Sequence, residues 1–204
     1  MLSFPSIIIF LLIAILFYTF YSLIKKAFEE VGFTGWESSI IVFGSIILGM
    51  VNLPLFKYKG WVIGINLGGA LLPIIISIYL MAKNKIFFRV IIGIALISYI
   101  TYNFTYVSNR GIISPFPLWL LPPIAASMYS IMVSIKSKRK AASIAYSSGT
   151  MGALIGADFL HLKELLSLRP HAGAMAVIGG ASILDMVFLT GVIAVIVDAL
   201  LYES

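Results

Sequence analysis

Long apolar runs, separated by short groups of polar residues, recur along the whole chain. A helix crosses the hydrocarbon core of a bilayer with about 20 predominantly apolar residues, because each residue adds about 1.5 Å. The runs therefore predict an all-α, polytopic transmembrane helical bundle of about seven spans, with residues 1–204 forming a single integral membrane domain. The predicted spans cover residues 4–24, 39–56, 61–81, 86–107, 112–133, 143–162 and 173–201.

Two of the predicted spans have features that a plain helix does not explain. The span at 39–56 is short, so it either crosses the bilayer or re-enters from one side. The span at 112–133 holds Pro115, Pro117, Pro122 and Pro123, so it either kinks or begins as non-helical chain. The apolar N-terminus has no basic stretch before it and no small-residue cleavage site. We interpret it as a retained span rather than a signal peptide.

The distribution of Lys and Arg predicts the orientation of the bundle, because basic residues are enriched in cytoplasmic loops. With the N-terminus outside, nine basic residues fall at inner loops and five at outer loops. The inner group is Lys25, Lys26, Lys83, Lys85, Arg89, Lys136, Lys138, Arg139 and Lys140, and the outer group is Lys57, Lys59, Arg110, Lys163 and Arg169. The sequence therefore predicts an outside N-terminus and an inside C-terminus.

The composition changes this picture little and narrows the function classes. Hydrophobic residues make up 61% of the chain and charged residues 11%, against roughly 25% charged in soluble domains. We therefore expect a multi-pass protein of the cell membrane with the lipid bilayer as its partner. The bases behind the net charge of +6 are scattered between apolar runs, which excludes a nucleic-acid-binding face. Because the chain has no cysteine, thiolate metal sites and cysteine nucleophiles are excluded. We predict no cofactor, and the oligomeric state stays open.

Two aspartates, Asp158 and Asp185, interrupt apolar segments near the C-terminus. An ionisable side chain at the centre of a membrane helix costs about 2.5 to 3.5 kcal/mol, so its presence indicates a role. The midpoint between them lies in "RPHAG", where Pro170 and Gly173 predict a turn. In an antiparallel helical hairpin centred there, each carboxyl lies about 20 Å from the turn. The spacing therefore predicts that the two carboxyls are neighbours.

A close pair of carboxyls in an apolar site shares a proton, because both cannot ionise easily. In aspartic proteases such a pair activates water and polarises the scissile carbonyl. The most concrete hypothesis is thus an aspartyl peptidase that cleaves a membrane-embedded peptide, with Asp158 and Asp185 as the catalytic residues. A transporter or channel that binds a proton or a cation is the alternative. The third hypothesis is that the two aspartates form a hydrogen-bonded pair with a purely structural role, and all three hypotheses stay open.

Further polar and small residues are candidates for a site beside the aspartates. His161 follows Asp158 by three positions, which is the spacing of half a carboxylate–histidine metal site. The midpoint of Asn52 and Asn66 is residue 59, so we expect the two amides at one level near the outer surface. Together with these asparagines, we place three more residues around a cavity or a substrate: Gly180, Ser182 and Thr190.

Two other features of the last spans predict packing rather than chemistry. Ala145, Gly149, Gly152 and Gly156 lie on the face of their helix opposite Asp158, and such a stripe of small residues is typical of closely packed membrane helices. We assign Asp198, near the inner end of the last span, to the membrane interface.

The segments "GTMGALIGADFLHL" and "GGASILDMVFLTGVIA", with "NLGGALLP" as weaker support, resemble an uncharacterised prokaryotic family of multi-spanning membrane proteins. The resemblance implies a common fold and no known activity. A looser likeness to presenilin-type aspartyl intramembrane proteases is limited to the two aspartates. Ala157 stands before Asp158 where those proteases have Tyr, no Gly-x-Gly-Asp precedes Asp185, and no Pro-Ala-Leu follows it.

Overall fold

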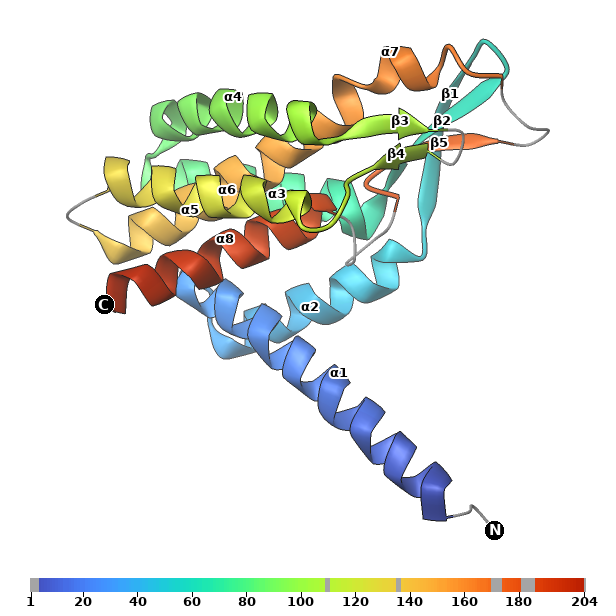
Figure 1. Cartoon of the computed structure of the whole chain (residues 1–204). Helices are drawn as coiled ribbons and strands as arrows, with labels where there is room; N and C mark the ends of the chain where they lie inside the picture. The colour runs from blue at the N-terminus through green and yellow to red at the C-terminus, as the bar shows by residue number, and fades with distance from the viewer. Residues whose placement is uncertain (1–3, 109–110, 135–136, 170–173, 181–185, 204) are drawn as a thin grey trace.

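The computed structural model describes residues 4–108, 111–134, 137–169, 174–180 and 186–203, and most of them are helical (Figure 1). The helical elements are α1 (Phe4–Glu30), α2 (Gly35–Gly49), the π-helical segment η1 (Leu67–Leu71), α3 (Leu72–Asn84), α4 (Phe87–Phe104), the 3₁₀ turn η2 (Leu118–Leu120), α5 (Leu121–Val133), α6 (Lys138–Ala153), the π-helical segment η3 (Leu154–Phe159), α7 (Leu162–Leu165) and α8 (Met186–Glu203). The strands are β1 (Asn52–Tyr58), β2 (Trp61–Asn66), β3 (Tyr106–Ser108), β4 (Gly111–Ile113) and β5 (Met175–Ile178).

The helix α6 forms the centre of the bundle, with α3, α4, α5 and α8 packed around it. All residues from 141 to 150 are buried, and most of them are Ala, Ser, Gly or Thr. Small side chains allow helix backbones to approach closely. A Cβ atom at Gly152 would lie 2.5 Å from Ile97 Cβ, and one at Gly156 would lie 2.6 Å from Ser98 O, both on α4. The predicted glycine seam is therefore confirmed.

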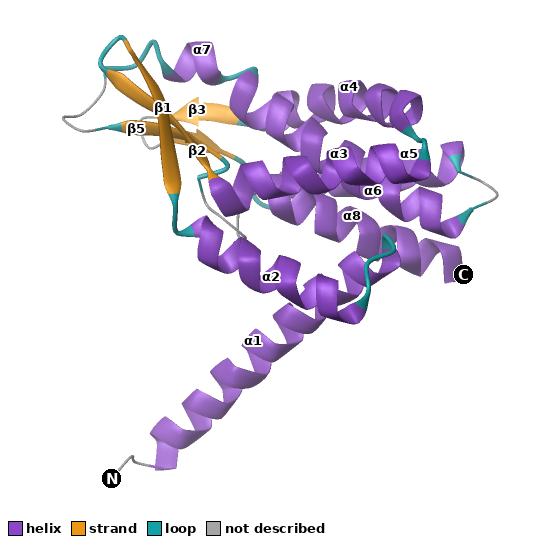
Figure 2. Ribbon diagram, turned by 180° about the vertical axis from the view of Figure 1, so that it is seen from behind, coloured by secondary structure: helices purple, strands orange, loops and turns teal. Residues whose placement is uncertain are grey.

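The strands correct the expectation of an all-α fold. β1 and β2 form an antiparallel hairpin, and β5 pairs with β2 in parallel, so that the sheet order is β1-β2-β5. The two-residue turn consists of Lys59 and Gly60, which both have positive φ angles of 48° and 84°, as the turns of tight hairpins require. The predicted helical spans are wrong at 52–56, 61–66, 106–107, 112–113 and 175–178. In β1 and β2, aromatic and β-branched residues on both sides of the tight turn favour strands. The sheet lies at one end of the bundle (Figure 2).

A second hairpin, β3–β4, lies at the same end of the bundle and connects α4 to α5 along the chain. The chain after β4 passes through Pro115 and Pro117 without helical structure, and Pro122 and Pro123 occupy the first turn of α5. Proline is tolerated there because the first N–H groups of a helix have no intrahelical partner. The prediction that this segment begins as non-helical chain is confirmed.

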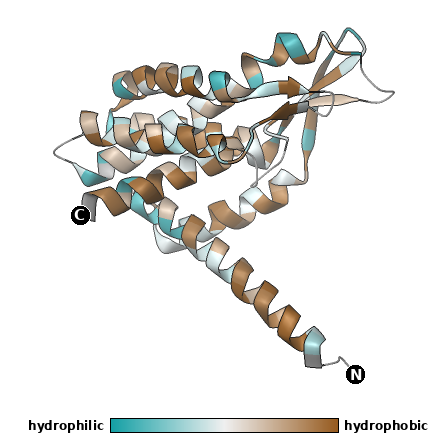
Figure 3. Ribbon diagram, in the orientation of Figure 1, coloured by the Kyte–Doolittle hydropathy of each residue, from teal (hydrophilic) through white to brown (hydrophobic). Residues whose placement is uncertain are grey.

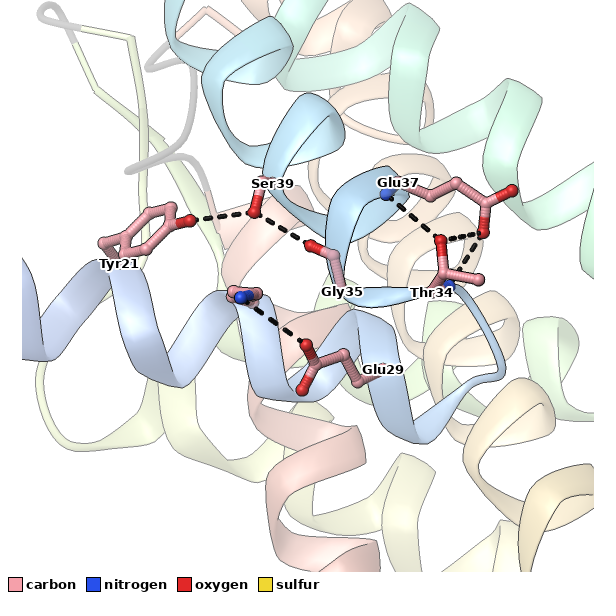
Figure 4. A network of polar contacts seen from close by, with 7 residues as sticks. Tyr21, Glu29, Thr34, Gly35, Glu37 and Ser39 are labelled. Carbon is pink, nitrogen blue, oxygen red and sulfur yellow. Dashed lines mark hydrogen bonds and ion pairs between the residues drawn. The ribbon is translucent and has the colours of Figure 1, made fainter.

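The N-terminal helix α1 projects from the bundle (Figure 1). Every residue from 5 to 19 is exposed, whereas Ile24 and Phe28 pack into the core. Tyr21 on α1 shares a 2.9 Å hydrogen bond with Ser39 on α2. The turn between them ends in a capping box, in which the Thr34 side chain accepts a hydrogen bond from the Glu37 N–H and the Glu37 carboxylate accepts one from the Thr34 N–H (Figure 4). These contacts hold the second half of α1 against the bundle.

The outside of the bundle is apolar. Among the described residues, three helical stretches are long and apolar enough to cross a membrane, namely Pro5–Glu30, Leu67–Asn84 and Phe87–Phe104. Large apolar side chains also face outward on the shorter helices α2 and α5, for example Phe43 and Met132. An exposed apolar surface of this extent is typical of contact with lipid.

Candidate functional site

Two π-helical segments distort the helices at the end of the bundle where the sheet lies. The segment η1 precedes α3, and η3 follows α6. Such segments are rare and occur frequently at functional sites. Each carries a polar residue predicted from the sequence, because Asn66 caps η1 and Asp158 lies within η3.

Asn66 is 1% exposed and uses both ends of its side-chain amide. Its Oδ1 atom accepts hydrogen bonds from the N–H groups of Gly68 and Gly69, at 3.1 and 2.7 Å. Its Nδ2 atom donates to the carbonyl of Gly49 at 2.7 Å and to Asn52 Oδ1 at 2.8 Å. Asn66 therefore ties the start of η1 to the end of α2 and to β1.

The expectation that Asn52 and Asn66 lie at one level is confirmed, although they lie on strands instead of helices. They are direct partners in the β1–β2 register. Their pairing depends on a register shift between Pro54 and Phe56, which adds one residue to β1 relative to β2. Asn52 is exposed and Asn66 is buried, so the pair spans from the surface to the interior.

Asp158 is half-buried, and its Oδ2 atom accepts a 2.8 Å hydrogen bond from the N–H of Gly179. Gly179 follows β5 and has a φ angle of +69°. A Cβ atom at this position would lie 2.6 Å from the Cβ of Ala70 in η1. Only glycine suits both the left-handed backbone and this close approach. Asp158 thus joins η3, the end of β5 and η1 in one place.

Two predicted site residues, Asp185 and Ser182, lie outside the described residues, so the predicted contact between Asp158 and Asp185 stays a prediction. The helical hairpin behind that prediction is wrong, because the chain between them contains α7 and β5. Gly180 is exposed in the turn after β5. Thr190 is fully buried on α8, and its backbone carbonyl lies 3.3 Å from where a Cβ of Gly149 would stand.

His161 lies beside η3 with its ring stacked on Tyr102 at a centroid separation of 4.6 Å. Its Nε2 atom is 3.3 Å from the carbonyl of Tyr102, and its Nδ1 atom is 3.3 Å from the carboxylate of Glu164. In the part of the chain that the structure describes, no group of three His, Asp or Glu residues could hold a metal ion. A metal-ligand role for His161 stays a prediction.

A second polar region lies deeper in the bundle, where α5, α6 and α8 meet. Asp198 on α8 is fully buried, and its Oδ1 atom lies 2.6 Å from Ser130 Oγ on α5. Among the described residues, the buried hydroxyls of Ser127, Ser147 and Thr190 have no hydrogen-bond partner, and neither does Asp198 Oδ2. The bundle therefore encloses polar groups behind an outer surface with many large apolar side chains.

The structure shows that the side chain of Asp198 is buried inside the protein, whereas the predicted depth of Asp198 at the membrane interface stays a prediction. Asp198 follows Gly191 and Ala194 at intervals of seven and four residues, which places all three on one helix face. Small residues mark the face of α8 that packs against α6, since a Cβ at Gly191 would overlap the side chain of Thr150. This spacing was the available signal that Asp198 points into the protein.

Comparison with known proteins gives a family and no activity. The family model described as "Protein of unknown function (DUF1614)" matches residues 8–197. The chain belongs to this family. The predicted membership of an uncharacterised family is confirmed, and the likeness to presenilin-type proteases finds no support. No curated protein and no solved structure matches the chain.

Proposed function

We propose that this member of the DUF1614 family carries protons across a membrane, through the region where α5, α6 and α8 meet. The observation that carries the proposal is the group of buried hydroxyls without hydrogen-bond partners, among the described residues, in a bundle with an apolar exterior. Burying an unpaired hydroxyl costs about 1 to 3 kcal/mol. A proton passes between hydroxyls and water by exchange and needs no wide pore, which suits a closely packed interior better than a hydrated cation does.

The two carboxyls lie at opposite ends of this region. Thr190 on α8 lies level with Gly149 on α6. Asp158 lies nine residues from Gly149 toward the sheet, and Asp198 lies eight residues from Thr190 the other way. At 1.5 Å per residue, the axial separation of the two acids is about 25 Å. This is close to the roughly 30 Å of a bilayer core, which supports Asp158 and Asp198 as the terminal proton-binding groups.

Proton flux into liposomes tests the proposal. The purified protein is reconstituted with a pH-sensitive dye inside, and a potassium diffusion potential drives protons inward. We expect Asp158→Asn and Thr190→Val to reduce the flux by about tenfold or more, as expected for loss of a proton-transfer group. Thr19→Val is the matched control, because Thr19 is exposed on α1. Flux that does not require the protein, or wild-type flux in both test variants, overturns the proposal.

Seven membrane crossings with the N-terminus outside form the second part of the proposal. The elements α1, α2, α3, α4, α5, α6 and α8 would each cross once, with the sheet at the outer side. Because the chain has no cysteine, single cysteines report their own accessibility. We expect Lys59→Cys to react with a membrane-impermeant maleimide in intact cells, and Lys85→Cys only after permeabilisation. The reverse labelling would contradict this orientation.

An aspartyl peptidase is the second candidate, favoured by the position of Asp158. The side chain is half-buried at a π-helical distortion, and the N–H of Gly179 orients its carboxylate. Oriented carboxylates of this kind serve as general bases. A peptidase requires that Asp158→Asn and Asp185→Asn each abolish cleavage of membrane-embedded peptides by folded protein. If both variants only lose thermal stability in detergent, a structural role replaces both candidates.

A further inference from the structure

The contact between Asp198 and Ser130 specifies where a proton is bound. Both side chains are fully buried, and the Asp198 Oδ1 atom lies 2.6 Å from Ser130 Oγ. The same Ser130 Oγ atom lies 2.6 Å from the backbone carbonyl oxygen of Ser127. One hydroxyl oxygen therefore stands within hydrogen-bond distance of two other oxygens.

A serine hydroxyl has a single hydrogen to donate and can accept two hydrogen bonds. The carbonyl of Ser127 can only accept, so its bond uses the hydrogen of Ser130. The contact with Asp198 is then a hydrogen bond only if the carboxyl group supplies the hydrogen. A carboxylate has none, whereas a carboxylic acid has one.

We infer that Asp198 is a proton-binding site, in which the protonated acid donates a hydrogen bond to Ser130 and Ser130 donates to the carbonyl of Ser127. At 2.6 Å the two side-chain oxygens are in direct hydrogen-bond contact, and a contact of this kind requires a hydrogen between them. We therefore infer a proton as the ligand of this site.

The surroundings of Asp198 agree with a neutral acid. Its Oδ2 atom is buried and has no hydrogen-bond partner among the described residues, and an ionised carboxylate left in that state is costly. Two charged groups on neighbouring helices interact with its carboxyl group. Lys138 on α6 attracts a carboxylate, and Glu30 on α1 repels one, so the two interactions oppose each other. The segment of α5 that packs against it contributes no charged residue.

The place of this site in a transport cycle rests on the proposed function, with Asp198 releasing or receiving the proton at the end of the bundle opposite the sheet. The protonated state of Asp198 does not depend on that proposal. Asp198 can be protonated in a protein that carries no protons across the membrane, and proton flux can occur in a protein whose Asp198 is ionised. The two can therefore be tested separately.

Infrared spectroscopy of the purified protein tests the protonated state. A carboxylic acid has a carbonyl-stretch band that a carboxylate lacks, and an ester-free detergent keeps this spectral region clear. At pH 7 we expect the wild type to have such a band, Asp198→Asn to lose it, and Asp158→Asn to retain it. We expect Ser130→Ala to shift the band to higher frequency, because the acid loses its hydrogen-bond acceptor.

An unchanged spectrum in Asp198→Asn at pH 7 overturns the inference. If Asp198→Asn fails to fold, the band of Ser130→Ala decides, and no shift in a folded Ser130→Ala protein likewise overturns it. Replacing choline chloride by sodium chloride at constant pH separates the two ligands. A band that falls with sodium identifies a cation site and contradicts a proton site, whereas an unchanged band supports the proton.

Discussion

The helices α1 and α6 are opposite in both composition and surroundings. α1 is strongly apolar over most of its length, and its residues 5–19 are exposed (Figure 3). α6 is rich in Ser, Ala and Gly, and residues 141–150 are buried on every side. In a water-soluble protein the apolar helix would be inside. The inversion indicates that the protein meets an apolar solvent and encloses polar groups.

The difference between α1 and α6 also explains which membrane helices can be predicted from hydropathy. A helix in contact with lipid must be apolar, whereas a helix enclosed by other helices must mainly be small enough to pack. The stretches that pass the apolar criterion include α1 and α4 but not α6, although α6 is the most enclosed. Hydropathy alone therefore misses α6, whereas its small residues identify it as a closely packed helix.

A charge on the exposed half of α1 tests most directly whether this helix is in contact with lipid. Leu12 is 61% exposed, and an aspartate at the centre of a lipid-facing helix costs about 3 kcal/mol. We expect Leu12→Asp to reduce membrane insertion strongly, measured as the membrane-bound fraction after expression. Leu12→Ala is the control and should insert normally. Equal insertion of the two variants would mean that this half of α1 does not face lipid.

The interior is tested by adding one methyl group to α6. A Cβ at Gly152 would lie 2.5 Å from the Cβ of Ile97 on α4, and overpacking of this kind costs about 1 to 3 kcal/mol. We expect Gly152→Ala to lower the thermal unfolding temperature in detergent. Gly44→Ala is the matched control, because no atom lies within 4 Å of a Cβ there. Similar unfolding temperatures would contradict the close packing of α6 on α4.

Hydropathy predicted the helical bundle and most segment positions, but it could not predict the strands. The predicted spans 39–56 and 61–81, on either side of Lys59 and Gly60, are each mostly apolar, and an average over about 20 residues does not separate a period of two from a period of 3.6. The local signal was the tight Lys-Gly turn between runs rich in aromatic and β-branched residues. The contact of Asn52 with Asn66 was predicted from a turn centred on residue 59, whereas the turn is centred between Lys59 and Gly60, and the two residues are partners because a register shift between Pro54 and Phe56 adds one residue to β1.

Substitutions of Asn66 and Asn103 compare a buried side-chain amide with an exposed one. Asn66→Ala removes the hydrogen-bond partner of the Gly68 and Gly69 N–H groups and of the Gly49 carbonyl. We therefore expect the free energy of unfolding to fall by about 2 kcal/mol. Asn103 is the control, since its side chain is exposed and donates to the carbonyl of Tyr99. Asn103→Ala should change stability by less than about 0.5 kcal/mol. Chemical denaturation in mixed micelles measures both, and equal losses would show that the cap of η1 contributes little.

The candidate site was only partly predictable. Asp158 was found because a charge in an apolar helix is expensive, and this argument needs no fold. Its contact with Gly179 was not foreseen, because the bond depends on the pairing of β5 with β2, which are more than 100 residues apart. The burial of Asp198 was not foreseen, because its position near a helix end was weighed above the small residues on its face. Depth along a helix and direction around it are separate quantities, and only the second decides burial.

The smallest expected effect concerns the turn that joins the exposed helix α1 to the bundle. Thr34→Ala removes the side chain that accepts a hydrogen bond from the Glu37 N–H at the start of α2, and loss of such a cap costs about 1 kcal/mol. Thr19→Ala is the matched control, because Thr19 is exposed on α1 and donates to the carbonyl of Ile15 four residues before it. That bond adds little to a helix whose backbone bonds are already complete. Thermal unfolding in detergent should separate the two variants by a few degrees. If Thr34→Ala matches Thr19→Ala, then Tyr21 and the packed half of α1, rather than the cap, hold this helix in place.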